Sequence, residues 1–359
     1  MLLVMALVDV AKRAGVSIAT VSRVLNNEPG VRPETIKHVQ RALRATAYDP
    51  EAVRRGPRPG KRDGKKTRNI AVLVIGQTQE EWFRRPLFSA VVGGINRAAN
   101  DRDLQVLIDH VLDTESLSPS LRKGRIDGAL AFVAAHSDRR LLDAVRQQMP
   151  VVRLLGEEMA ADEVDQIGPD DIAVGRMGFG YLAKKGCERI AYVTSRPDHE
   201  ALVVRAMGLQ IAASKARVPN LRAFVCGPSD FGSMFGPNLF AGPDLESIAE
   251  AIANSNPRPD GLLVSQDVEA IGLYPMLVQR GIRPGTDIQI ISCNNDQSGT
   301  AMLNPRPATI DLGTDEIGRW AVTRLVNRIA RPSEKPIRML IAPKLVEPPS
   351  SSAGGPDRR

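Results

Sequence analysis

The chain has 359 residues, of which 43% are hydrophobic, 25% charged and only 4% aromatic. This composition is typical of a globular protein and excludes a disordered or fibrous chain. At roughly 150 residues per domain, the length predicts two or three domains, each large enough to bury a hydrophobic core.

Positive charge is concentrated at the amino end of the chain. Residues 1–68 contain 15 Lys and Arg against 6 Asp and Glu, a net charge of +9, whereas the whole chain has 48 against 41, a net charge of +7. The remaining residues therefore sum to about −2. This distribution predicts a module for a polyanion attached to a near-neutral body. Nucleic acid and an anionic membrane surface are the candidate polyanions.

The composition also bears on compartment and on metal binding. The three cysteines are far apart and show no metal-ligand spacing, so we expect no disulfide framework, no metal site and no cofactor. No apolar run approaches the roughly 18 to 20 residues that span a bilayer. The apolar start lacks the basic segment of a signal peptide. We therefore expect a cytoplasmic protein without a membrane partner, whose translation begins at Met1 or at Met5.

Residues 6–50 predict a small all-α domain. Apolar residues recur there at helical spacing in three short stripes, which can bury one another in one compact bundle. Gly15 is expected to close the first helix and Ser17 to cap the second. A helix, a glycine-containing turn and a second helix are typical of a helix-turn-helix unit, whose second helix enters the DNA major groove.

The outward face of the second helix supplies the candidate DNA contacts. Arg23 can reach a guanine edge with two hydrogen bonds, while Ile18 and Ala19 can contact thymine methyl groups. The alternative is a helical bundle in which Arg23 is simply solvated. Four further polar side chains suit phosphate oxygens, which set the register without reading sequence: Ser17, Thr20, Ser22 and Asn26.

The body begins after a linker. Residues 51–68 are rich in Gly, Pro and basic residues, which predicts a basic linker. From residue 69 to 345, apolar strand runs alternate with helix patterns, which predicts parallel sheets covered on both faces. The length fits two such sheets. Residues 348–359 have the composition of a disordered tail.

The residues of the head carry a family resemblance. The string from Asp9 to Asn26, with Ala14-Gly15-Val16-Ser17 and Thr20-Val21-Ser22-Arg23-Val24-Leu25-Asn26, closely resembles the head of the lac repressor (LacI/GalR) family. Similarity continues in the body, for example at Arg125-Ile126-Asp127-Gly128 and Ser265-Gln266-Asp267. The resemblance implies a helix-turn-helix head and a two-lobed, periplasmic-binding-protein-like α/β body. It also implies a homodimer or tetramer that binds a pseudo-palindromic operator and a small effector.

The sequence departs from the family pattern at the helix caps and at the hinge. The Thr or Ser that usually caps the first and third helices is Ala6 and Arg32 here, each losing a cap worth roughly 1 kcal/mol. The family places a Leu wedge for the minor groove in a short hinge helix, whereas this chain has Gly56-Pro57. Arg54 and Arg55 are expected to contact the DNA instead, by following phosphates or entering a narrow groove.

The resemblance also indicates an effector site. Arg205 and Asp267 match positions that hold ligand hydroxyl groups, and Phe231 matches an aromatic residue that stacks on the ligand. A carboxylate, a guanidinium and an aromatic wall suit a polyol. The alternative is a structural ion pair between Arg205 and Asp267. Trp82 is either a ligand wall or an exposed loop residue, and Arg85, where the family has Asn, suggests an unusual, acidic effector.

The expected function is therefore that of an effector-controlled, sequence-specific transcription regulator, acting as a repressor. Phosphate-loop and nucleophile-elbow motifs are absent, and the four histidines show no ligand spacing, so no enzyme activity is expected. The alternatives are a cytoplasmic sugar-binding protein and a sugar-metabolising enzyme, neither with specific DNA recognition.

Overall fold

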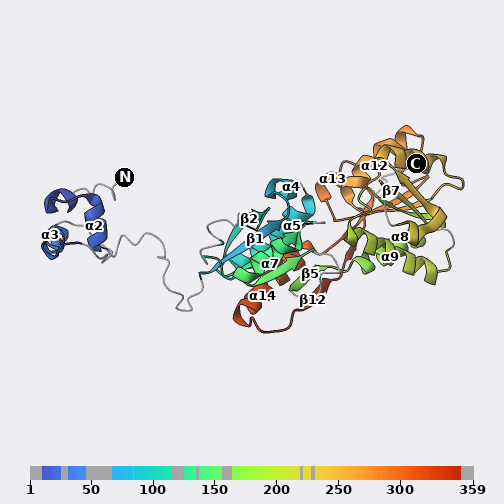
Figure 1. Ribbon diagram of the computed structural model, residues 1–359. Helices are drawn as coiled ribbons and strands as arrows, with labels where there is room; N and C mark the ends of the chain where they lie inside the picture. Colours follow the sequence, from blue (N-terminus) through green and yellow to red (C-terminus); the bar gives the residue numbers. More distant parts are fainter. Residues whose placement is uncertain are drawn as a thin grey trace, which may run out of the picture. The chain divides into compact units, whose positions relative to one another are not determined.

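The computed structural model divides the chain into two compact units, residues 1–65 and 66–359. They are called the head and the body here, and each is described by itself (Figure 1). The structure describes residues 10–25, 31–45, 67–83, 85–114, 121, 125–134, 137–155, 164–218, 221–227 and 231–348. Among these residues, no helix has the length and apolarity needed to cross a membrane.

The head is a bundle of short helices. Residues 10–14 are helical, and they are followed by α2 (Ile18–Leu25) and α3 (Pro33–Arg44). Gly15 adopts a φ of 65° at the turn, and the Thr20 N–H donates to Ser17 Oγ at 3.1 Å, which confirms the expected turn and cap. Arg32 precedes α3 and makes no side-chain cap. The helices bury a common core of Val10, Ala11, Val21, Val24, Val39 and Ala42.

The first lobe of the body is built on a six-stranded parallel sheet in the order β12-β5-β4-β3-β1-β2. Helices α5 and α14 pack on one face of this sheet and α7 on the other. Both faces are therefore buried, as an all-parallel sheet requires. Its elements are β1 (Asn69–Ile75), α4 (Gln79–Phe83), α5 (Pro86–Asn100), β2 (Gln105–Val111), β3 (Gly128–Val133), α7 (Arg139–Gln148), β4 (Val151–Leu154), β5 (Asp165–Pro169), α14 (Thr314–Ala330) and β12 (Arg338–Ile341).

The second lobe has a seven-stranded sheet in the order β13-β11-β10-β9-β6-β7-β8. Its strands are parallel except for β13, which pairs antiparallel with β11. Helices α8 and α9 cover one face and α11 and α12 the other. Its elements are α8 (Asp171–Lys184), β6 (Ile190–Thr194), α9 (Glu200–Lys215), β7 (Arg222–Cys226), α10 (Gly232–Phe235), η2 (Gly236–Asn238), β8 (Leu239–Gly242), α11 (Leu245–Asn254), β9 (Gly261–Val264), α12 (Asp267–Gln279), β10 (Gln289–Cys293), α13 (Gln297–Thr300), β11 (Ala308–Asp311) and β13 (Lys344–Val346).

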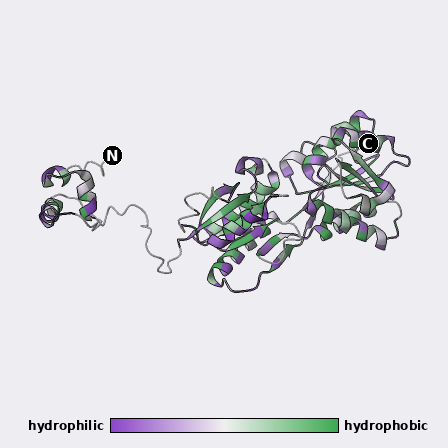
Figure 2. Cartoon of the chain, viewed as in Figure 1, coloured by the Kyte–Doolittle hydropathy of each residue, from purple (hydrophilic) through white to green (hydrophobic). Residues whose placement is uncertain are grey.

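The chain passes between the two lobes three times. It leaves the first lobe between β5 and α8, returns between β11 and α14, and leaves again between β12 and β13. These crossings make the lobes interdependent parts of one unit. In Figure 2 the strands of the sheets are largely hydrophobic, while hydrophilic residues lie mainly on the helices and loops around them. The expected fold class, two parallel-sheet lobes with a small helical head, is confirmed.

Glycines allow the helices that flank these crossings to approach closely. A Cβ on Gly175 of α8 would lie 2.0 Å from the Arg205 carbonyl oxygen of α9, and one on Gly208 would lie 2.3 Å from the Ile172 oxygen. In the first lobe, a Cβ on Gly318 of α14 would lie 2.5 Å from the Ile95 nitrogen of α5. Any larger residue would therefore push these helix pairs apart.

Candidate functional site

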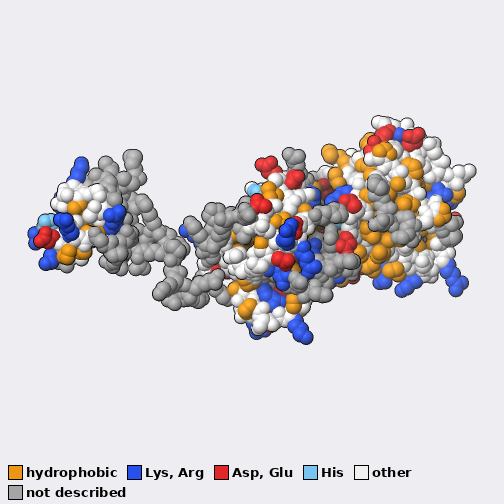
Figure 3. All heavy atoms as spheres, in the orientation of Figure 1, with side chains coloured by type: hydrophobic (Ala, Val, Ile, Leu, Met, Phe, Trp, Pro, Cys, Tyr) orange, Lys and Arg blue, Asp and Glu red, His pale blue; other side chains and the backbone are white. Residues whose placement is uncertain are grey.

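The head exposes a strongly basic surface. Within residues 10–25 and 31–45 the only acidic residue is Glu34, whereas six Lys and Arg side chains are exposed. Figure 3 shows several of these basic side chains on the visible face of the head. A surface with this charge attracts a polyanion. The exposed basic residues are Lys12, Arg13, Arg23, Arg32, Lys37 and Arg41.

The candidate DNA contacts lie mainly on α2. Arg23 is exposed in the last turn of this helix, and Thr20 is half-buried. Ser17 precedes the helix, where its hydroxyl also lies 2.9 Å from Thr20 Oγ1. Ile18, Ala19 and Ser22 belong to α2, but their side chains lie outside the described part of the structure. Asn26, Arg54 and Arg55 lie outside the described residues altogether.

In the body, Asp267 begins α12, directly after β9 at the carboxyl edge of the second sheet. It is 1% exposed. Its Oδ1 accepts hydrogen bonds from Ser292 Oγ and, at 2.8 Å, from Thr309 Oγ1, while its Oδ2 accepts one from the Asp296 N–H at 2.6 Å. Burial raises the pKa of Asp267 to about 6, although these hydrogen bonds oppose the rise. The carboxylate therefore joins the ends of β9, β10 and β11.

Arg205 lies on α9 and is 3% exposed. Its Nε donates to Asp171 Oδ1 at 2.6 Å, and its Nη1 donates to the Ser265 carbonyl oxygen at 2.7 Å. Burial opposes the charge of Arg205, but the Asp171 carboxylate raises the pKa of the guanidinium above its ordinary value. The ion pair that Arg205 forms is therefore with Asp171 at the start of α8, and not with Asp267.

A second buried carboxylate lies at the same edge of the sheet. Glu269 is 3% exposed and accepts a hydrogen bond from the Ser195 N–H at 2.7 Å, and others from the hydroxyl groups of Ser195 and Ser265. Burial raises the pKa of Glu269 above its ordinary value. Glu269 thus fixes the loop after β6 against the start of α12. Glu269 is not among the site residues predicted from the sequence, because nothing in its local pattern distinguishes a buried carboxylate in a helix from a solvated one.

The loop after β10 also contributes polar groups. Asn294 and Asn295 have φ angles of 104° and 56°, in the left-handed region that Asn tolerates better than most residues. Asn295 Nδ2 donates to Asp311 Oδ2 at 3.0 Å, close to the crossing from β11 to α14. The Asn294 side-chain oxygen is buried without a hydrogen-bond partner among the described residues. The pair Asn294-Asn295 was the available sequence signal for this polar loop.

The two aromatic candidates are both buried. Phe231 is 2% exposed and stacks on Tyr192 and Phe235, with ring centroids 6.1 and 5.8 Å away. Trp82 lies in α4, within the segment expected to be a loop, and is 7% exposed. Its ring centroid lies 5.5 Å from that of Phe88, and its Nε1 is buried without a hydrogen-bond partner in the described part of the chain.

Basic groups from both lobes come together near Trp82. The Arg85 guanidinium carbon lies 4.8 Å from the centroid of the Trp82 ring. The pKa of Arg85 is lowered by burial and by the charge of Arg196, in the second lobe. Burial and the charges of Arg196, Arg205 and Arg85 lower the pKa of His199 to about 4, outweighing the opposite effect of Asp198. Arg85, Arg196 and His199, called the basic cluster here, were not among the predicted site residues.

The basic cluster predicts a specific pH dependence of stability. His199 titrates near 6.5 in the unfolded chain and at about 4 in the folded one, so its contribution to stability is fully present above pH 6.5 and is lost progressively as the pH falls from 6.5 to 4. Between pH 7 and pH 5 this residue should lower the free energy of unfolding by about 2 kcal/mol. Urea unfolding at the two pH values should show a smaller loss in His199→Gln than in the parent protein. The same substitution at the exposed His38 should leave the loss unchanged, and an equal loss in His199→Gln would contradict the assignment.

Comparison with known proteins agrees with both units. The model of the lacI family of bacterial regulatory proteins matches residues 6–51, and a periplasmic binding protein-like domain matches residues 179–351. The ribose operon repressor of Escherichia coli K12 is 26% identical over 347 residues, covering 94% of this chain and 97% of the repressor. The transcriptional regulator CelR of Thermobifida fusca is 25% identical over 344 residues, covering 94% of this chain and 95% of that protein.

Solved structures show the same fold. A CelR–cellobiose complex superposes with a TM-score of 0.64 at 23% identity, covering 95% of this chain and 98% of the other. A lac repressor dimer bound to operator superposes with a TM-score of 0.63 at 21% identity, covering 94% and 96%. The head is that of the lacI family of bacterial regulatory proteins, the body is periplasmic-binding-protein-like, and the relatives match over nearly their whole length. The resemblance to the lac repressor (LacI/GalR) family of bacterial transcription regulators is therefore confirmed.

Proposed function

We propose that this chain is a sequence-specific repressor of transcription whose affinity for its operator is controlled by a small, sugar-like effector bound between the two lobes. The observation that carries the proposal is the basic head, in which an exposed Arg23 stands on the second helix of a helix-turn-helix unit. The relatives named above are regulators and not enzymes, which supports a binding function.

A dimer would present two copies of α2 to half-sites about one helical turn apart, on the order of 34 Å. In each copy, Arg23, Ile18 and Ala19 read bases. The phosphate contacts come from Ser17, Thr20, Ser22 and Asn26, with Arg54 and Arg55 added by the linker. Because Gly56-Pro57 offers no Leu wedge, the linker contributes mainly electrostatic attraction.

The effector would meet Arg205 and Asp267 at the carboxyl edge of the second sheet. Arg205 Nη2 donates no hydrogen bond to the described residues, and Asp267 Oδ2 accepts only one, so both have capacity for a ligand hydroxyl. Phe231 is buried in the core of the second lobe and Trp82 in the core of the first, so neither ring would be an exposed wall of the site. Binding between the lobes would change operator affinity through a coupling of roughly 1 to 3 kcal/mol.

The direct test is selection of DNA. The full chain is incubated with a randomised pool of duplexes at fixed, near-physiological salt, and the bound fraction is sequenced after several rounds. Enrichment of a pseudo-palindrome would support a site-specific dimer and give its half-site spacing. Binding that depends on salt but enriches no sequence, with and without candidate sugars, would overturn the proposal.

The selected operator then allows a test of Arg23. Arg23→Ala should weaken binding to the operator by about 1 to 3 kcal/mol and relax the preference at one base pair of each half-site, because a bidentate contact to guanine is lost. Fluorescence anisotropy with the operator and its single-base variants measures both effects. Lys37→Ala removes the same charge from the exposed surface of α3 and should leave base preference unchanged. If Arg23→Ala kept the base preference of the parent protein, the proposal that Arg23 reads a base would be wrong.

A further inference from the structure

The residues of the basic cluster come from both lobes and are basic groups that repel one another when charged. Arg85 belongs to the first lobe, at the start of α5, while Arg196 and His199 lie in the second lobe, between β6 and α9. The charge of Arg196 lowers the pKa of Arg85, and the charges of both arginines lower the pKa of His199, so the three groups lie close together. Within the described part of the body, neither Arg85 nor Arg196 forms an ion pair, and His199 Nδ1 is buried without a hydrogen-bond partner.

The nearby carboxylates offset the charge of the cluster only in part. Glu81 raises the pKa of Arg85, but less than burial and Arg196 lower it, and it also accepts hydrogen bonds from the Thr78 N–H and hydroxyl at 2.9 and 3.0 Å. Asp171 pairs with Arg205. Asp198 raises the pKa of His199, but its effect is smaller than that of the surrounding arginines. The repulsion among the cluster's basic groups is therefore not cancelled by the protein itself.

The local backbone adds to the positive potential. Arg85 and His199 are the N-cap residues of α5 and α9, helices of 15 and 16 residues, and neither side chain caps its helix. By contrast, Asp138, Asp170 and Asp244 cap α7, α8 and α11 with side-chain oxygens. Helix N-termini carry a partial positive charge and unpaired N–H groups that favour anions. The unpartnered Trp82 Nε1, in the ring beside Arg85, is a further buried donor.

From these contacts we propose that the effector carries an oxyanion, a phosphate ester or a carboxylate, which Arg85 and Arg196 bind from opposite lobes beside His199. This inference rests on the proposed function, since it names the chemical class of the effector. Arg85 Nη2 already donates to Gln77 Oε1 at 3.2 Å. An oxyanion would remove the repulsion between the arginines and accept hydrogen bonds from their other donors, whereas a neutral hydroxyl would leave the repulsion in place. Because the two arginines belong to different lobes, the anion holds the lobes together and so couples binding to their relative position.

The first experiment uses the full chain and simple anions. Sulfate and inorganic phosphate are titrated against chloride at matched ionic strength, and the melting temperature is recorded. We expect a saturable rise for sulfate and phosphate only. Arg196→Gln should abolish this rise, while Lys215→Gln, which removes an exposed charge at the far end of α9, should retain it. Equal responses to chloride and to sulfate, or an unchanged response in Arg196→Gln, would overturn the proposal.

The second experiment identifies the source of the oxyanion by calorimetry. The affinity for glucose is compared with the affinities for glucose 6-phosphate and gluconate, and the affinity for ribose with those for ribose 5-phosphate and ribonate. At least one phosphate or carboxylate should bind ten-fold or more tighter than its parent sugar, and Arg196→Gln should lose at least ten-fold of that affinity. Tighter binding of the neutral sugars would refute the inference. The DNA-selection experiment distinguishes the two proposals. If the chain selects an operator but binds neutral sugars more tightly, the oxyanion proposal is refuted while the proposed repressor function stands.

Discussion

Replacing Arg205 by Met should lower the free energy of unfolding by about 3 to 5 kcal/mol, because the substitution leaves the Asp171 carboxylate buried without its counter-charge. Both side chains are almost fully buried, with 4% and 12% exposed. The Ser265 carbonyl oxygen loses a hydrogen bond as well. Urea unfolding of the full chain, followed by circular dichroism, measures the loss.

Two further variants separate the ion pair from the volume change. The double variant Arg205→Met with Asp171→Leu should recover much of the stability, because replacing both charges by apolar groups removes the uncompensated one. Arg283→Met is the control, because Arg283 also pairs with a carboxylate, that of Asp287, but its side chain is 72% exposed. This variant should leave the unfolding midpoint nearly unchanged. A single variant as stable as the parent would show that the pair contributes nothing to folding.

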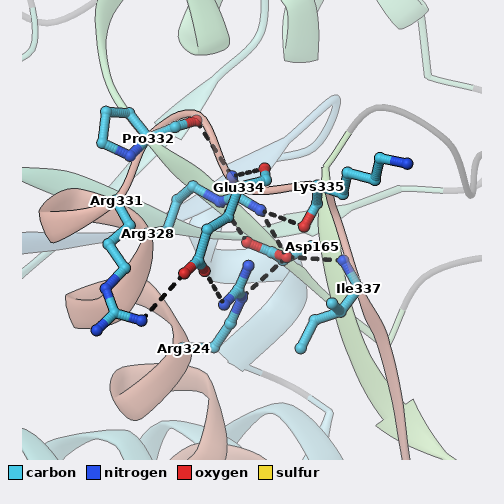
Figure 4. A network of polar contacts seen from close by, with 8 residues as sticks. All are labelled: Asp165, Arg324, Arg328, Arg331, Pro332, Glu334, Lys335 and Ile337. Atoms are coloured by element: carbon cyan, nitrogen blue, oxygen red, sulfur yellow. Dashed lines mark hydrogen bonds and ion pairs between the residues drawn. The ribbon is translucent and has the colours of Figure 1, made fainter.

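Asp165→Ala should have an effect of similar size, about 3 to 5 kcal/mol, for the same reason in the first lobe. Asp165 is fully buried at the start of β5 and binds Arg328 Nε and Nη2 at 2.7 and 3.0 Å and the Ile337 N–H at 2.9 Å (Figure 4). Arg324 Nε lies 2.9 Å away in ion-pair contact. Although burial opposes its charge, hydrogen bonds from Arg328 and Ile337 hold the pKa of Asp165 below its usual value. The Asp165 carboxylate therefore links the start of β5 to the end of α14 and to the segment that leads into β12.

A nearby ion pair provides the control for Asp165→Ala. Arg331 and Glu334 form a contact at 3.2 Å on the outside of the same network, with side chains 74% and 37% exposed. Arg331→Ala should therefore change the unfolding midpoint very little. If Asp165→Ala behaved like Arg331→Ala, the buried network would have no larger role than a surface ion pair. The Asp165 variant should also increase hydrogen exchange in β5 and β12, which the exposed control should not do.

Elements with a strong local signal could be predicted from the sequence. In the body, α11 (Leu245–Asn254) and β3 (Gly128–Val133) coincide with apolar patterns that are visible in the sequence. Other elements have a weak local signal. Strand β5 reads Asp-Gln-Ile-Gly-Pro, and α14 buries two arginines that look like solvated residues in the sequence.

The sequence by itself determined the order of the domains, the alternation of strands and helices, and the position of Arg23 on the second helix of the head. These features depend on neighbouring residues, whose side chains alternate or recur at fixed local spacing. Only the tertiary structure decided that Arg205 pairs with Asp171, that Trp82 is buried, and that Arg85 lies near Arg196 and His199. Such pairings depend on where distant segments meet and on how much water remains between them, which no local periodicity encodes.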